Sequence, residues 1–306
     1  MKKTLDLEGV RRLSISTIGA DVDIVPLKET GKKLVYEVFG NTEDYSPEIK
    51  RHGDVLILNF EPEKKLLGFL PIGRSSDVSR VELHVPGGLR ELKVRSTSGD
   101  IAVKDLNIDD LVMNTVSGDF NISRMRIDIL NASNVSGCFS GKDISCRENC
   151  TVSTISGDCY LNFRGDGPRV MKASTVSGDL TVLLENIVGL EVKVSSVSGT
   201  FSHSIPLMKV SKGVYKTNGA VNRSLVFSSV SGDIILKSYE HEKTTVDDTA
   251  DDYEIIMGEE ARKIIRMLED GKLTKEQAEE LLRALGYEEN EISSLLGKEG
   301  EEMGQA

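Results

Sequence analysis

Five aspartates occupy the same place in a short phrase that recurs along the chain. The phrase is a small polar residue, a second residue that is apolar in most copies, then Ser-Gly, and five of its seven copies end in Asp: Asp100, Asp119, Asp158, Asp179 and Asp233. If the copies stack, these carboxylates lie ~4.8 Å apart, the spacing of neighbouring strands. Like charges at that distance favour a bound cation, and repeat-bound calcium occurs in glycine- and aspartate-rich β-helices. The candidate calcium ligands are therefore Asp100, Asp119, Asp158 and Asp179.

A structural role for these aspartates is the competing interpretation. Two copies replace the aspartate, by Cys138 and by Thr200, whereas the Ser-Gly pair occurs in all seven. A cation site needs the carboxylates, but a turn needs only the glycine and a small polar partner. We therefore favour turn chemistry over calcium and predict no cofactor.

The histidines and cysteines could support acid–base, nucleophilic or metal chemistry, but they form no local motif. They are His52, His84, His203, His241, Cys138, Cys146, Cys150 and Cys159. Cys146 and Cys150 lack a second ligand pair nearby, so small buried roles are favoured over a zinc or redox site. A polysaccharide-cleaving β-helix would need clustered carboxylates or a positioned base. We predict no catalytic residue and a protein that is not an enzyme.

The negative charge of the chain lies in its last part. Of the net charge of −11, residues 240–306 contribute 20 acidic and 8 basic side chains, and the residues before them 29 and 30. Neither part has the basic stripe that a nucleic-acid backbone requires, so nucleic-acid binding is not expected. No apolar run approaches the ~18–20 residues of a membrane span, and no apolar signal region follows Met1. We expect a cytoplasmic protein without membrane insertion.

The spacing of the phrase decides the fold class. Its glycines follow one another at steps of 19, 19, 20, 21, 21 and 33 residues: Gly99, Gly118, Gly137, Gly157, Gly178, Gly199 and Gly232. A period near twenty residues is typical of stacked repeats. With the glycine as position 0, apolar residues recur at −7 and −5 and at +2 and +4, the period of a strand with one buried face. We predict a mainly β protein, a parallel β-solenoid with two short strands per coil, each coil stacked on the previous one in sequence.

The phrase itself is expected to form a corner between the two strands of a coil. The residue at −2 shares its parity with +2 and +4, so we expect it to point inward after a bend near −3. The small polar residue at −3 can bond a neighbouring backbone group. The glycine either adopts a positive φ or lets the adjacent coil approach closely. Ser at −1 and Asp at +1 should face outward or cap the turn.

Irregular β sequence precedes the repeats. Residues 1–90 are predicted to form a β cap that shields the open strand edge of the solenoid, which then occupies residues 91–238. Within the cap, residues 13–24 resemble a degenerate coil with Gly19 in the place of the repeat glycine.

An insertion at about residues 206–222 accounts for the final step of 33 residues. Its alternating pattern predicts a hairpin, with Asn218-Gly219 as the turn. Because insertions often carry the binding face of a solenoid, we predict an interaction surface that includes Tyr215. A loop without a binding role is the alternative.

The composition changes abruptly after the repeats. We predict an acidic linker over residues 239–257, a helical hairpin over 258–297 and a disordered tail over 298–306. Thr274 and Gln277 have the spacing of a capping box for the second helix. Because so small a hairpin buries little by itself, its apolar residues form a second predicted surface, for a protein partner or for self-association. These residues are Ile264, Leu268, Leu281 and Leu285.

With these motifs placed, residues 10–238 resemble the bacterial β-strand-repeat family of uncharacterised function that carries the label "putative adhesin". The segment Ile264–Leu285 is similar to SHOCT-like short helical domains, which implies a role in oligomerisation or protein contact. Some members that combine the two parts are associated with envelope-stress systems, which implies a regulatory setting. The family supplies no catalytic residues.

Three functions remain to be weighed. The first is a non-enzymatic scaffold that presents surfaces to protein partners, and it agrees with all of the patterns above. The alternatives are a surface adhesin, for which we find no export signal, anchor or sorting motif, and a carbohydrate-active β-helix enzyme. We predict the scaffold.

Overall fold

The computed structural model describes residues 1–28, 31–41, 45–60, 66–67, 70–71, 78–239 and 274–284. The chain divides into two compact units, Met1–His241 and Glu242–Ala306. Within the described part, no helix is both long enough and apolar enough to cross a membrane.

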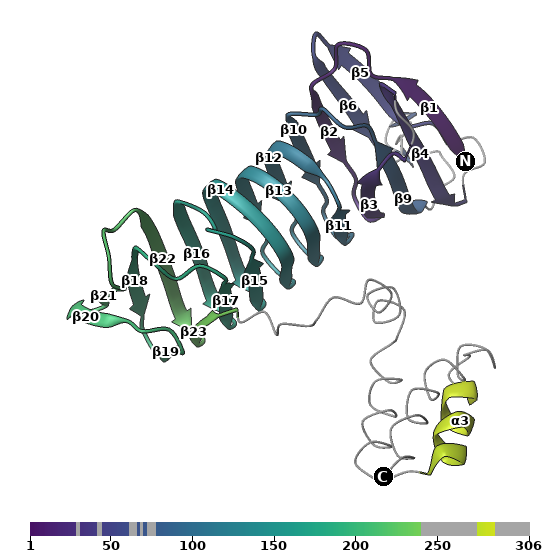
Figure 1. Ribbon diagram of the computed structural model, residues 1–306. Helices are drawn as coiled ribbons and strands as arrows, with labels where there is room; N and C mark the ends of the chain where they lie inside the picture. Colours follow the sequence, from purple (N-terminus) through teal and green to yellow (C-terminus); the bar gives the residue numbers. More distant parts are fainter. Residues whose placement is uncertain are drawn as a thin grey trace, which may run out of the picture. The chain divides into compact units, whose positions relative to one another are not determined.

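The first unit is a stack of coils whose equivalent strands form two long ladders (Figure 1). One ladder runs, in order of pairing, through β5 (Glu48–His52), β6 (Val55–Asn59), β2 (Arg12–Ser16), β10 (Glu91–Arg95), β12 (Asn107–Asn114), the second halves of β13 (Phe120–Ser133) and β14 (Phe139–Ser156), β16 (Val170–Ser177), β22 (Arg223–Ser231), β18 (Leu190–Ser196), β21 (Val214–Lys216) and β20 (Met208–Ser211). The other runs through β1 (Lys2–Asp6), β4 (Lys33–Gly40), β9 (Val78–Val85), β3 (Asp21–Pro26), β11 (Ile101–Lys104), the first halves of β13 and β14, β15 (Cys159–Phe163), β17 (Leu180–Leu184), β23 (Ile234–Ser238) and β19 (Phe201–His203). The predicted mainly β, parallel solenoid is confirmed; a separate short pair joins β7 (Leu66–Leu67) to β8 (Leu70–Pro71).

The core consists of the four predicted columns. At −7, −5, +2 and +4, nearly every side chain is buried, from Leu92 and Val94 in one coil to Ile234 and Leu236 in another. Parallel pairing at unshifted register places each column member directly over the next, as in Ile101↔Phe120. Each coil therefore buries its apolar face only against its neighbours, which makes the core narrow and continuous.

The predicted burial of the −2 column is wrong. Its side chains are 44–53% exposed in Val116, Val135, Ile155, Val176 and Val230. The inward parity of −7 and −5 instead continues to −3, where Thr115, Thr154 and their equivalents are buried. The chain turns at −2 and −1, both of which face outward, and not at −3.

The coils do not stack in the order of the sequence, contrary to our expectation. The last coil of the sequence, β22 with β23, pairs with β16 and β17 on one side and with β18 and β19 on the other. The coil β18–β19 therefore ends the stack. The final coil of the sequence, β22 with β23, lies between it and the coil β16–β17 (Figure 1). The hydrogen bonds of a parallel ladder form with any strand edge that is unpaired and correctly oriented, so the order of coils in the sequence does not fix their order in the stack.

The solenoid also begins earlier than the repeats. Within the segment predicted as cap, β2 and β3 pair in parallel with β10 and β11. The register Ile101↔Val22 puts Ala20, and not Gly19, in the place of the repeat glycine. The placement of Gly19 was thus wrong by one residue.

Antiparallel strands close both ends of the stack. At one end β4 covers β9, β1 covers β4, and β5 covers β6. At the other end β20 and β21 form the predicted hairpin against β18. Its turn lies at Lys212-Gly213, so the predicted turn at Asn218-Gly219 is wrong.

In the second unit the described part is one helix, α3 (Lys275–Ala284). The predicted capping box is present, since the backbone N–H of Gln277 donates to Thr274 Oγ1 and that of Thr274 donates to Gln277 Oε1. Ala278 and Leu282 are fully buried. The rest of the predicted helical hairpin, the acidic linker and the tail lie outside the described residues.

Candidate functional site

Two features of the solenoid recur from coil to coil and could carry function. The first is the phrase corner, which comprises positions −3 to +1 of each copy. The second is the arginine corner, formed where Arg124, Arg147 and Arg164 each bond an acidic residue of an adjacent coil.

At the phrase corner, the glycine is required by backbone packing. A Cβ added to Gly157 would lie 2.2 Å from the carbonyl oxygen of Gly137, and one on Gly232 would lie 2.1 Å from that of Gly178. Gly157 also has a φ of +141°, a conformation that L-residues rarely adopt. Both reasons offered from the sequence, positive φ and close approach, therefore hold at the same residue.

The outward aspartates link each coil to the next. Asp100 Oδ1 accepts the backbone N–H of Asp119 at 2.7 Å, and Asp119 Oδ1 accepts that of Cys138, also at 2.7 Å. Asp179 in turn accepts the N–H of Asp233 at 2.8 Å, across the out-of-order coil. Thr200 belongs to the coil that ends the stack, and the described part of the chain has no further coil whose N–H an aspartate there would accept, which explains one of the two missing aspartates.

The calcium candidates Asp100, Asp119, Asp158 and Asp179 all lie in this ladder, and each Oδ1 accepts a backbone N–H. Among the residues that the structure describes, no group of three or more His, Cys, Asp or Glu side chains could hold a metal ion. The ladder gives these carboxylates a structural role that needs no cation.

The small polar residue at −3 bonds the backbone in only some coils. Ser96 Oγ accepts the N–H of Gly99 at 2.8 Å, and Ser196 Oγ does the same for Gly199. In inner coils the glycine N–H instead bonds the next coil, as Gly157 bonds the carbonyl of Ser177. The corresponding hydroxyl groups are buried without a partner in the described structure: Thr115, Thr154, Thr175 and Ser229.

At the arginine corner, successive coils are joined by ion pairs. Arg164 Nε donates to Asp143 at 2.9 Å, and Arg147 Nε and Arg124 Nε bond Asp128 and Asp105 in the same way. The partners are 19 to 21 residues apart, one coil of the stack. A guanidinium has five N–H donors, so each pair leaves donors that can bond a ligand.

Two hollows lie along this corner and share Ser145 and Arg164; together they are called the arginine groove. Their volumes are about 750 Å³ and about 370 Å³. The charged lining residues are Arg124, Arg126, Arg147, Arg164, Arg169, Arg223, Asp143, Glu148 and Asp166. The groove crosses several coils because its lining comes from β13, β14, β22 and the segments that follow β15 and β17.

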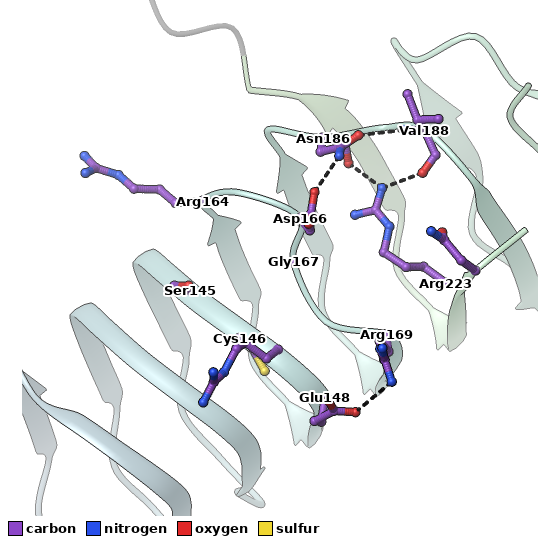
Figure 2. A pocket seen from close by; sticks show the side chains of 12 residues that line it. Ser145, Cys146, Glu148, Arg164, Asp166, Gly167, Arg169, Asn186, Val188 and Arg223 are labelled. Atoms are coloured by element: carbon purple, nitrogen blue, oxygen red, sulfur yellow. Dashed lines mark hydrogen bonds and ion pairs between the residues drawn. The ribbon is translucent and has the colours of Figure 1, made fainter. Parts of the chain in front are cut away.

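Arg223 is the most enclosed of these arginines, with only 6% of its surface exposed. Its Nη2 donates to the carbonyl oxygens of Val188 at 2.7 Å and Asn186 at 2.9 Å (Figure 2). Burial lowers the pKa of Arg223, but a guanidinium remains charged at neutral pH. Within the described residues it forms no ion pair with a carboxylate, so a fixed positive charge lies in the wall of the groove.

The acidic side chains of the groove are already engaged. Asp166 accepts from the Asn186 side chain at 2.6 Å, and Glu148 pairs with Arg169 at 3.7 Å (Figure 2). Cys146 also lines the groove, but burial raises its pKa to about 12, so it is a thiol and a poor nucleophile at neutral pH. The groove therefore has the chemistry of an oxygen-binding surface, with guanidinium donors suited to carboxylate or phosphate groups.

The residues proposed from the sequence lie elsewhere. Tyr215 is half-buried in β21, with its ring centroid 5.1 Å from that of Phe201. Ile264, Leu268 and Leu285 lie outside the described residues, as does the side chain of Leu281 in α3.

Sequence reasoning missed the arginine groove entirely. The available signal was an acidic residue followed one coil later by an arginine, at Asp105 and Arg124, and again at Asp143 and Arg164. This signal lies outside the phrase, on which the alignment of coils was centred.

Comparison with known proteins identifies a family that part of the sequence matches. Residues 10–163 match the family described as Toastrack DUF4097, and no curated protein matches the sequence. A putative cell adhesion protein from Clostridium sporogenes has 12% identity and a TM-score of 0.38 over 78% of this chain and 98% of its own. A putative adhesin from Bacteroides fragilis has 13% identity and a TM-score of 0.41 over 78% and 96%. Because the family match spans half of the sequence, the chain belongs to the Toastrack DUF4097 family.

Proposed function

We propose that this protein is a non-enzymatic binding scaffold and that the arginine groove binds an acidic polysaccharide. The observation that carries the proposal is the row of arginines along two adjoining hollows, which includes the enclosed Arg223, whose bonds within the described structure go to backbone carbonyls. The solenoid supplies a regular frame, because parallel ladders join each coil to its neighbours and ion pairs add to them at Arg124, Arg147 and Arg164.

The chemistry of the lining favours a charged sugar chain. Guanidinium groups donate in pairs to carboxylates, and Asn186 and Asn222 add amide groups that can bond hydroxyls. The hollows follow one another across several coils, so an extended ligand can contact more arginines than a compact one. Several weak contacts along one ligand give an overall affinity higher than that of any single contact.

A binding role is favoured over catalysis by the state of the acidic groups. Sugar hydrolysis requires two carboxyl groups, one of them free to protonate a leaving oxygen. In the groove Asp143 and Glu148 are paired with arginines and Asp166 with an amide. The raised carboxyl pKa found in the described part belongs to Asp110, caused by burial and by neighbouring carboxylates, and Asp110 does not line the groove.

Binding of polygalacturonate, measured by titration calorimetry, tests the proposal. Replacing Arg164 and Arg169 together by alanine is expected to weaken binding at least about a hundredfold, because each arginine contributes a hydrogen bond to a charged group of ~1.5–3 kcal/mol. The matched control replaces Arg90 and Arg95, two exposed arginines outside the groove, and should bind like the wild type. Equal binding of neutral dextran, or no loss in the groove variant, would contradict the proposal.

We retain a second role for the C-terminal unit, that of contact with a protein partner or with another copy of the chain. It is supported by the capped helix α3, which lies within the predicted helical hairpin. The cytoplasmic location expected from the sequence and the link to bacterial envelope stress that the family resemblance implies both belong to this part of the proposal.

Two measurements test this second role. Pull-down and sedimentation of the full chain are compared with those of a chain ending at Lys237; identical partners and oligomer size would exclude it. Cell fractionation separates the cytoplasmic scaffold from the alternative of a surface adhesin, in which the same groove would bind polysaccharide outside the cell.

A further inference from the structure

The two ends of the solenoid expose different kinds of surface. At the end closed by β1, β4 and β5, the outer strands carry charged side chains such as Lys2, Lys50 and Arg51, which discourage pairing with another chain. The opposite end, which we call the hairpin end, exposes Val197, Met208, Lys209, Val210 and Lys212. We propose that the hairpin end binds the surface of an anionic lipid bilayer.

Three apolar side chains at the hairpin end are more than half exposed. Met208 and Val210 are 55% and 59% exposed, and Val197 is 79% exposed. Val197 is the −2 residue of the terminal coil, which has a neighbour on one side only. All four residues of β20 are exposed, and within the described structure this outer strand is paired along one edge only, with β21. Clustered exposed apolar side chains mark surfaces that contact proteins or membranes.

The charges beside these apolar groups are positive. Lys193 and Lys216 both pair with Glu191, at 2.8 Å and 3.1 Å. Lys209 and Lys212 form no ion pair with any described residue. Exposed apolar side chains with unpaired lysines are the combination that binds anionic lipid, because the side chains enter the interface while the ammonium groups contact phosphates.

A hollow beside the turn supplies a place for a lipid headgroup. It has a volume of about 580 Å³ and is lined by Lys193, Lys212, Ser195 and Ser196, among others. The two ammonium groups and the Ser195 hydroxyl can bond one phosphate group, whereas the Ser196 hydroxyl already donates to the carbonyl of Gly199. The hollow opens next to the exposed strand β20, whose partner β21 contributes Val214 to its wall. Headgroup binding and shallow insertion of Met208 and Val210 are therefore compatible at one surface.

Flotation of the full chain with lipid vesicles tests this inference. We expect binding to vesicles of phosphatidylcholine mixed with phosphatidylglycerol, little binding to phosphatidylcholine alone, and loss of binding in high salt. Replacing Lys209 and Lys212 by glutamate should reduce partitioning at least 25-fold, since each lysine near an anionic surface contributes about fivefold. Replacing Met208 and Val210 by serine should weaken binding but leave its salt dependence.

Matched controls separate this surface from general stickiness. Lys142 and Lys172 are exposed lysines in the middle of the stack, and Val116 and Val135 are exposed valines of the phrase corner. Glutamates at the two lysines, or serines at the two valines, should leave vesicle binding unchanged. Binding that is equal for both lipid mixtures, or that survives the Lys209 and Lys212 change, overturns the proposal. So does an absence of vesicle binding combined with a dimer that M208S/V210S dissociates, which would assign the surface to self-association.

Discussion

The phrase corner joins coils along the whole stack, whereas the arginine corner joins the coils that carry Arg124, Arg147 and Arg164, and the two differ in what they leave free for a ligand. At the phrase corner the glycine backbones lie in contact, and each aspartate oxygen is directed at an N–H of the next coil. At the arginine corner the bonds are made by long side chains on the surface, and donors remain free beside two hollows. Regular backbone packing thus favours stability at one corner, whereas side-chain pairing leaves room for binding at the other.

The largest expected effect is on the phrase corner. Gly157→Ala places a methyl group against the Gly137 carbonyl and forces an unfavourable φ, so we expect a loss of about 3 kcal/mol or more in the free energy of unfolding. Gly165 also has a positive φ, but a methyl group there would meet nothing within 4 Å, so Gly165→Ala should cost only ~1 kcal/mol. Urea unfolding of both variants measures the difference, and equal costs would remove close approach as the reason for the glycine.

A smaller loss is expected from the aspartate ladder. Asp119→Ala leaves the N–H of Cys138 without its acceptor, which should cost about 1 kcal/mol. Asp119→Asn keeps an oxygen at the same position and should cost less. If the asparagine variant is as unstable as the alanine variant, the charge and not the hydrogen bond is what matters.

The arginine corner should respond differently. Arg164→Ala removes an exposed ion pair, which typically contributes less than ~1 kcal/mol, so unfolding should change little. Polysaccharide binding by the same variant should fall at least severalfold. A large loss of stability without a loss of binding would reverse the roles that we assign to the two corners.

Acid should weaken the ladder at the end of the stack. The backbone N–H and the hydroxyl of Thr200 both donate to Asp233, and these bonds lower the pKa of that carboxyl. The stabilisation is therefore complete above the pKa of the unfolded chain and is lost as the pH falls through the folded value. In Thr200→Val one donor is gone, so the loss of thermal stability between neutral pH and about pH 3 should be smaller than in the wild type. An identical pH profile would contradict this coupling.

Removal of metal should have the smallest effect. Because the ladder carboxylates accept backbone N–H groups, we expect the same melting temperature with and without a calcium chelator. A lower melting temperature in the chelator, restored by calcium and absent in Asp119→Asn, would revive the calcium interpretation.

Features that arise within a single strand could be predicted from the sequence, whereas features that depend on where the chain turns could not. The columns that contain Leu92, Val94, Ile101 and Val103 could be predicted because alternation with a period of two is a property of a single strand. The exposure of Val116 could not, because parity fails where the chain turns, and the position of the turn depends on which side chains fit inside the corner.

The sequence by itself determined the parallel solenoid, its four core columns and the outward direction of the aspartates, since these follow from local periodicity and from the glycine of each phrase corner. Only the tertiary structure decided that β22 and β23 insert beneath the coil β18–β19, and that arginines from different coils line one groove. The physical reason is that contacts between coils join residues about twenty positions apart or more. Such contacts depend on which strand edges are free to pair, and no local sequence pattern specifies those edges.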